Sequence, residues 1–200
     1  MAGLASGTGN KRDLLANRGD DLYQSPPEAV EALCRIENLP ERIWEPACGP
    51  GAIVKVLRER GRDVLATDLV DYQSPYQDAS GVDFLIPGIA ESYAGDGSRV
   101  IVTNPPFKNA HLFVARALTM APTVYMLLRL AFLESEKRRD IIDNSGLRTV
   151  HVFRKRLPMM HREGWEGRKA NSGMAFAWFV WERGYTGPTH LRRVSWEEFQ

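Results

Sequence analysis

The four residues from Asn104 to Phe107 combine groups that could hold a ligand at the end of a β-strand. The run before them, residues 100–102, is continuous and β-branched, which is typical of a strand buried on both faces in a parallel sheet. Pro105 and Pro106 have no N–H donor and fix φ, so the strand must end there in a rigid turn. The amide of Asn104 and the ring of Phe107 would then be held at the strand tip. Taken alone, this motif could also be a simple strand-ending turn.

Two further strand tips carry residues that could bind a ligand. The stretch EPACGPG, residues 45–51, follows one expected strand as a glycine turn, and Asp68 ends the next strand. An acidic side chain at that second tip can accept hydrogen bonds from ribose hydroxyls. A nicotinamide fingerprint would need a third glycine where Val54 stands. The pattern therefore favours a nucleoside cofactor but disfavours a nicotinamide-dependent oxidoreductase.

Strands and helices alternate along the chain around these tips. Helices are expected at residues 26–37, 52–60, 110–121 and 135–144, with Ser25 and Glu28 forming a capping box and Asn109 capping the third helix. Strands are expected from residue 42 to the glycine turn, at 63–68, 99–103, 123–133, 149–157 and 174–184, and as one edge strand near 82–86. This alternation predicts a doubly wound parallel sheet that binds ligands at the strand carboxyl ends.

The composition fits one compact α/β domain. The chain has 200 residues, of which 44% are hydrophobic, and we expect a flexible arm at 1–20 and a single domain at 21–200. A net charge of +1 means that any attraction to nucleic acid must be local. Two cysteines, four histidines without metal-ligand spacing and no apolar leader indicate a cytoplasmic protein without a metal site. No apolar run reaches the length of about 20 residues that spans a bilayer.

Five stretches, taken in order, resemble a known enzyme family. YQSPPEAV, EPACGPG, ATD, DFL and TNPPF are similar to the motifs of amino-group methyltransferases that use S-adenosylmethionine. The pattern most resembles the N6-adenine nucleic-acid enzymes whose cofactor motifs precede the catalytic motif, and it covers roughly residues 20 to 183. The resemblance implies a Rossmann-like, mostly parallel seven-stranded sheet with an antiparallel C-terminal strand and helices on both faces.

The resemblance also implies a binding site for S-adenosylmethionine. Its residues would be Tyr23, Ser25, Glu45, Ala47, Cys48, Gly49, Gly51, Asp68, Asp83 and Phe84. Among them, Glu45 and the glycines would line the methionine end, Asp68 would hold the ribose, and Asp83 with the next residue would flank the adenine. Read without the resemblance, Ser25 could simply cap a helix, Tyr23 could pack against that helix, and Cys48 could be a small buried side chain.

The resemblance assigns catalysis to Asn104, Pro105, Pro106 and Phe107. An exocyclic aromatic amine is a poor nucleophile because its lone pair is delocalised into the ring. Hydrogen bonds from its N–H groups to the Asn104 side-chain oxygen and the Pro105 carbonyl could reduce that delocalisation, and the prolines would hold both acceptors in place. Phe107 would offer a stacking surface, and the proton would leave to water after methyl transfer.

The expected substrate is adenine N6 in DNA, with extrusion of the base if the DNA is duplex. Adenine in RNA and glutamine in protein remain alternatives, because both present a flat, weakly nucleophilic NH2 group. A non-catalytic subunit that binds cofactor or nucleic acid is an alternative from another class.

A basic stretch follows the strand expected at 149–157. Residues 154–169 carry six Lys or Arg against two Glu. We expect substrate contacts there from Arg156, Arg162, Trp165, Arg168 and Lys169, with Lys108 beside the catalytic motif. The alternative is a solvated loop, and for Lys108 an exposed charge at the start of a helix.

Overall fold

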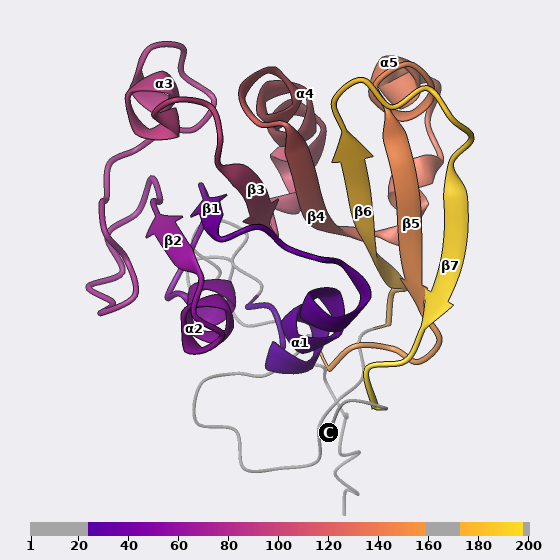
Figure 1. The fold of residues 1–200 in the computed structure, drawn as a ribbon, viewed down its shortest axis with the longest axis horizontal. Coiled ribbons are helices and arrows are strands. Elements are labelled where there is room, and N and C mark those ends of the chain that lie inside the picture. Colours follow the sequence, from indigo (N-terminus) through magenta and orange to yellow (C-terminus); the bar gives the residue numbers. More distant parts are fainter. Residues whose placement is uncertain (1–23, 159–172, 198–200) are drawn as a thin grey trace, which may run out of the picture.

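A seven-stranded sheet forms the centre of the protein, which is described here by a computed structural model (Figure 1). The structure describes residues 24–158 and 173–197. In chain order the strands are β1 Arg42–Glu45, β2 Asp63–Ala66, β3 Val100–Thr103, β4 Thr123–Arg129, β5 Leu147–Phe153, β6 Phe176–Glu182 and β7 His190–Val194. Their order across the sheet is β2-β1-β3-β4-β6-β5-β7.

All strand pairs are parallel except those that β6 makes with β4 and β5. This mostly parallel, doubly wound sheet confirms the predicted fold class. β1 pairs directly with β3, with Ile43 opposite Val100 and Trp44 opposite Ile101. The glycine turn after β1 and Asn104 after β3 therefore leave the same edge of the sheet side by side, as predicted.

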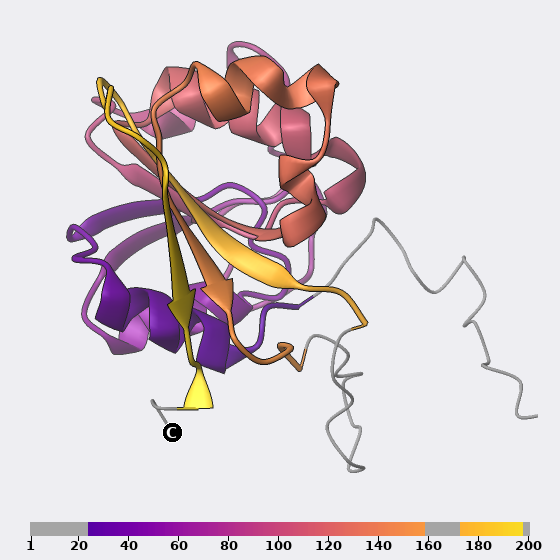
Figure 2. The ribbon, with the colours of Figure 1, turned by 90° about the vertical axis from the view of Figure 1, so that its right-hand side faces the viewer.

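Helices cover both faces of the sheet (Figures 1 and 2). One face carries α1 Pro27–Ile36 and α2 Ala52–Glu59, and the other carries α3 Ile89–Ala94, α4 Ala110–Met120 and α5 Arg139–Asp143. Short 3-10 helices span Phe107–Asn109, Leu130–Leu133 and Glu136–Arg138. Each face buries its own apolar cluster, so the sheet is hydrophobic on both sides, as a parallel sheet between helices requires.

Two strand predictions were wrong. Residues 82–86 form a turn instead of an edge strand, because Asp83 accepts hydrogen bonds from the backbone N–H groups of Leu85 and Ile86. The seventh strand is instead β7, which the sequence did not indicate because four of its five side chains are exposed and give no hydrophobic pattern. The helix α3 was also missed, within a stretch that reads as a loop.

Several predicted boundaries shift in the structure. β4 stops at Arg129, and the chain turns into a 3-10 helix while Leu130 N–H donates to the carbonyl of Ala175. Ser25 is not the cap of α1: Pro26 occupies the cap position, and Pro27 is the first helical residue. Asn109 does stand at the N-cap of α4, but its side chain makes no capping hydrogen bond.

No helix in the described parts of the chain is long and apolar enough to cross a membrane.

A buried ionic network ties α1 to the sheet. Glu37, at the C-terminal end of α1, lies 2.7 Å from His151 Nε2 and accepts a hydrogen bond of 2.7 Å from Arg148. The His151 side chain is 1% exposed and that of Glu37 is 9% exposed. Burial alone would raise the pKa of Glu37, but the hydrogen bonds from His151 and Arg148 outweigh it and hold the pKa below its usual value.

We predict that Glu37→Gln lowers the free energy of unfolding by about 2 kcal/mol near pH 7, since it removes a charge-assisted pair of hydrogen bonds. A carboxylate with a lowered folded-state pKa stabilises the protein above its unfolded pKa, and this contribution is lost as pH falls through the folded pKa. Urea unfolding from about pH 7 down to about pH 3 should therefore show the variant and the wild type converging at acid pH.

Glu136→Gln is the matched control, because it breaks an exposed pair in which Glu136 lies 3.6 Å from Arg139. Equal effects of the two substitutions would contradict a structural role of Glu37.

Candidate active site at the carboxyl edge of the sheet

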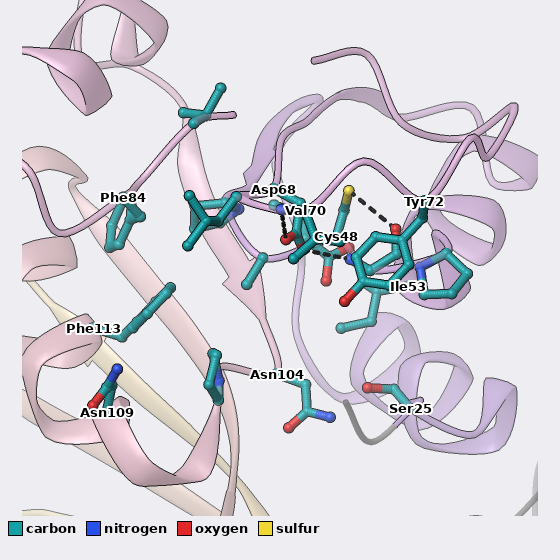
Figure 3. A pocket seen from close by; sticks show the side chains of 18 of the residues that line it. Ser25, Cys48, Ile53, Asp68, Val70, Tyr72, Phe84, Asn104, Asn109 and Phe113 are labelled. Atoms are coloured by element: carbon teal, nitrogen blue, oxygen red, sulfur yellow. Dashed lines mark hydrogen bonds between the residues drawn. The ribbon is translucent and has the colours of Figure 1, made fainter. Parts of the chain in front are cut away.

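A pocket of about 420 Å³ opens at the carboxyl ends of β1, β2 and β3 (Figure 3). The segments after these strands and the N-terminal parts of α2 and α4 supply its walls. Figure 3 shows Phe84, Phe113 and Asn109 toward one end of the pocket and Cys48, Ile53 and Tyr72 toward the other. Asn104 lies between these two groups, so the pocket reaches the Asn-Pro-Pro-Phe motif.

Glu45 is the most buried ionisable group of the pocket. It is the last residue of β1, is 2% exposed and lines the pocket. Burial, and secondarily the negative charge of Asp68, raise the pKa of the Glu45 carboxyl well above its ordinary value. Its Oε2 atom is buried and accepts no hydrogen bond from the described residues. A buried carboxyl without a partner is costly, and a cationic ligand in the pocket would compensate it.

Asp68 closes the turn between the tips of β1 and β2. One carboxylate oxygen accepts the Gly49 N–H at 2.8 Å, and the other accepts the Val70 N–H at 2.9 Å. Asp68 also lines the pocket, and a carboxylate oxygen can accept more than one hydrogen bond. Gly49 has a φ of +53°, a left-handed conformation that glycine adopts without strain.

Gly51 serves packing in this structure. Its φ is +95°, and a Cβ at this position would lie 2.2 Å from the Cβ of Tyr76. Gly51 therefore lets the loop after β2 pack onto the start of α2, and it does not line the pocket.

Aromatic rings form the end of the pocket that lies away from Cys48 and Tyr72. Phe84 stacks on Phe113 with ring centroids 5.1 Å apart, and the edge of Trp44 meets Phe84 at 5.4 Å. Asp83 and Asn109 line the same end and are polar. A flat heterocycle with amino groups would find an apolar wall and hydrogen-bonding partners there.

Cys48 lines the pocket and is not a nucleophile. Burial raises the pKa of its thiol far above the ordinary value, and the nearby Glu45 and Asp68 charges raise it further. The thiolate is therefore not populated near neutral pH.

The Asn-Pro-Pro-Phe motif is held rigidly at the tip of β3. Pro105 is buried, while Asn104 and Pro106 line the pocket. The Oδ1 atom of Asn104 is buried, and the nitrogen end of its amide points toward Ser25 (Figure 3). Phe107 lies outside the pocket lining, where its ring packs against Phe176 with centroids 5.7 Å apart and lies under the guanidinium of Arg129 at 4.3 Å.

The structure brings most of the predicted site residues together. Those that line the pocket are Ser25, Glu45, Ala47, Cys48, Gly49, Asp68, Asp83, Phe84, Asn104, Pro106 and Lys108. Gly51, Pro105 and Phe107 lie behind or beside it, and Arg156 is exposed just after β5. Tyr23, Arg162, Trp165, Arg168 and Lys169 fall outside the described residues, so their roles stay predictions.

Sequence reasoning missed several lining residues, among them Ile53, Val70, Tyr72, Asn109 and Phe113. The sequence positions of two of them could have indicated that they line the pocket. Asn109 and Phe113 lie one helical turn apart at the start of the helix that follows the motif, so both face the same strand tip. Among the described residues, no group of three or more His, Cys, Asp or Glu side chains could hold a metal ion.

No protein-family model and no curated protein matches the sequence. Solved structures do match the fold. The modification subunit of a proposed type I restriction enzyme from Vibrio vulnificus has a TM-score of 0.59 at 15% identity, over 87% of this chain and 46% of that one. The 23S rRNA methyltransferase ErmE has a TM-score of 0.56 at 15% identity, over 81% of this chain and 70% of its own.

A TehB-like SAM-dependent methyltransferase from Corynebacterium glutamicum has a TM-score of 0.50 at 17% identity, over 84% of this chain and 92% of its own. The chain shares the fold of these three proteins. It spans about half the length of the Vibrio subunit, with 46% of that chain covered.

We predict that Glu45→Gln stabilises the free protein as pH rises. A raised folded-state pKa means that the unfolded chain releases its proton first, so the wild type loses stability as pH climbs from the unfolded pKa toward the folded one. The neutral, isosteric glutamine has no proton to lose. We expect its melting temperature to exceed that of the wild type by about 3 °C at about pH 8 and by less near pH 5.

Glu41→Gln, at an exposed position just before β1, is the control and should leave the pH dependence of melting unchanged. A constant difference between Glu45→Gln and wild type across this pH range would show that burial does not perturb the Glu45 carboxyl.

Proposed function

We propose that this protein is an S-adenosylmethionine-dependent methyltransferase that modifies an exocyclic amino nitrogen, with adenine N6 in DNA as the favoured target. One observation carries the proposal. One pocket at the carboxyl edge of the sheet is lined both by Asn104 of the Asn-Pro-Pro-Phe motif and by the buried Glu45, whose Oε2 has no hydrogen-bond partner among the described residues. The fold shared with methyltransferases supports it.

The pocket residues fit the cofactor from end to end. Glu45 would hold the positive charge of the methionine portion, and Asp68 would accept the ribose hydroxyls. Asp83 and the aromatic wall of Phe84 and Phe113 would hold the adenine. When bound, the cofactor supplies a sulfonium methyl group, whose carbon bonds to the amine nitrogen while the electron pair of the broken C–S bond stays on sulfur.

Asn104 and Pro105 would orient the amine for this reaction. Their carbonyl oxygens can accept the two N–H groups and concentrate the lone pair on nitrogen, and the prolines keep both acceptors in place. Because Oδ1 of Asn104 is buried, a half-turn about its Cβ–Cγ bond would exchange the amide oxygen and nitrogen and present the acceptor to the substrate. The methylated nitrogen then loses its extra proton to water.

DNA, RNA and protein substrates can be separated by one experiment. The protein is incubated with tritiated S-adenosylmethionine and with DNA, RNA and protein pools from unmodified cells, and the labelled product is hydrolysed and identified. We expect label in N6-methyladenine from DNA. Label in RNA adenine or in protein glutamine would redirect the proposal to that substrate, and no label in any pool would favour a non-catalytic binding subunit.

Asn104→Ala tests the role of the motif. We predict that it lowers kcat by a factor of about 100 to 1,000, because it removes an acceptor that acts as charge develops on the amine. The dissociation constant for S-adenosylmethionine, measured by calorimetry, should change less than about threefold. Asn38→Ala, at an exposed position between α1 and β1, is the matched control. Equal losses in turnover and cofactor affinity would assign Asn104 to cofactor binding instead.

A further inference from the structure

Arg129 occupies an unusual position beside the catalytic motif. It is the last residue of β4, and it follows Tyr125 and Leu127 on the sheet face covered by α1 and α2. Thr103 at the end of β3 pairs with Met126, so Arg129 extends about 10 Å beyond that pair along its strand. Its side chain thus overhangs the rigid turn that carries Phe107.

The charge of Arg129 is poorly compensated. The side chain is half-buried and its Nε is fully buried, yet Nε meets no hydrogen-bond acceptor in the described residues. No carboxylate of residues 24–158 or 173–197 forms an ion pair with it. Within the described part of the chain, the only polar or ring contact of its guanidinium is with the ring of Phe107, at 4.3 Å. A cation–π contact compensates only part of the cost of desolvating a guanidinium, so this site is suited to an anion.

Arg129 and the expected substrate compete for the same surface. The guanidinium covers one face of the Phe107 ring, and Phe176 packs against that ring at a tilt of 46°. A planar base that stacks on Phe107 must therefore take the place of the guanidinium. The displaced group would remain tethered at the end of β4, where it could reach for the backbone of the same nucleotide.

We propose that Arg129 is a phosphate-binding residue for the target nucleotide. In the free protein its guanidinium holds the face of Phe107, and on substrate binding it exchanges the ring for the phosphate beside the extruded base. Guanidinium suits both partners, because it stacks flat on aromatic rings and binds phosphate with two parallel hydrogen bonds. This inference rests on the proposed function, and it makes the substrate a nucleotide within a nucleic-acid strand.

Arg138 provides a matched control. Its guanidinium also lies over an aromatic ring, that of Phe132, at 4.5 Å. Unlike Arg129, it donates hydrogen bonds to the carbonyls of Ala131 and Phe132. Arg138→Gln therefore also removes one positive charge and one cation–π contact, but the guanidinium that it removes already has hydrogen-bond acceptors.

The experiment measures binding of a fluorescein-labelled single-stranded DNA of about 20 nucleotides to the full chain, by anisotropy between about 50 and 200 mM salt. Arg129→Gln should weaken binding about tenfold and reduce the slope of log Kd against log salt by about 1. Arg129→Lys should keep the slope, because it keeps the charge. Arg138→Gln should leave affinity and slope near those of wild type.

A merely structural role of Arg129 is tested by four further readouts. The melting temperature and the dissociation constant for S-adenosylmethionine should not change in Arg129→Gln, whereas KM for the oligonucleotide should rise about tenfold with little change in kcat. In the wild type, the Arg129 Nε–H resonance, identified by its loss in Arg129→Lys, should shift when the DNA is added. That measurement decides the question even if Arg129→Gln does not fold.

Each negative result has a distinct meaning. If the wild type methylates nucleic acid while Arg129→Gln and Arg138→Gln behave alike, the inference is wrong and the proposed function stands. If the wild type transfers no methyl group but binds DNA with an Arg129-dependent slope, the proposed function is wrong and the phosphate site stands. No binding of DNA by the wild type, or no shift of the Nε–H resonance, overturns the inference.

Discussion

β1 pairs in parallel with β2 on one side and with β3 on the other, so three chain segments leave the sheet at the same edge. Every group of the candidate site depends on this arrangement. Glu45, Asp68 and Asn104 end or follow these three strands and are far apart in the sequence. Backbone hydrogen bonds hold neighbouring strands about 5 Å apart, and this spacing brings the three side chains together. Local structure alone could not bring together residues so far apart in the sequence. The pocket is thus a consequence of strand order, and the side chains decide what it binds.

The pocket contains two carboxyl groups, and basic side chains lie at its outer margin. Inside, Glu45 and Asp68 lie close enough for Asp68 to raise the pKa of the Glu45 carboxyl, and that carboxyl has no partner among the described residues. At the margin, Lys108 lines the entrance and Arg129 overhangs the motif from β4. A cationic ligand inside and an anionic polymer outside would each find compensating charge.

Rigidity is concentrated at the point where the two partners would meet. The two prolines after Asn104 remove backbone freedom and donors, and the buried Pro105 anchors the turn against the core. The side chains around this turn could exchange contacts: a half-turn of the Asn104 amide would exchange its oxygen and nitrogen, and the Arg129 guanidinium rests on a ring that a base could occupy. Fixed backbone with exchangeable side-chain contacts suits a site that must grip a flat group and release it.

The alternation of strands and helices, the fold class and the three strand tips could all be predicted from the sequence, because β-branched runs, prolines and glycines act through neighbouring residues. The sequence did not reveal β7, whose exposed side chains carry no hydrophobic pattern and whose pairing with β5 is made by backbone groups. It also placed a strand at residues 82–86, where the Asp83 side chain forms a turn. Three features became visible in the three-dimensional structure alone: the buried Glu45 has no hydrogen-bond partner for its Oε2 among the described residues, Asn109 and Phe113 line the pocket, and Arg129 covers Phe107. These properties depend on contacts between residues distant in sequence, and such contacts leave no periodic signal in the chain.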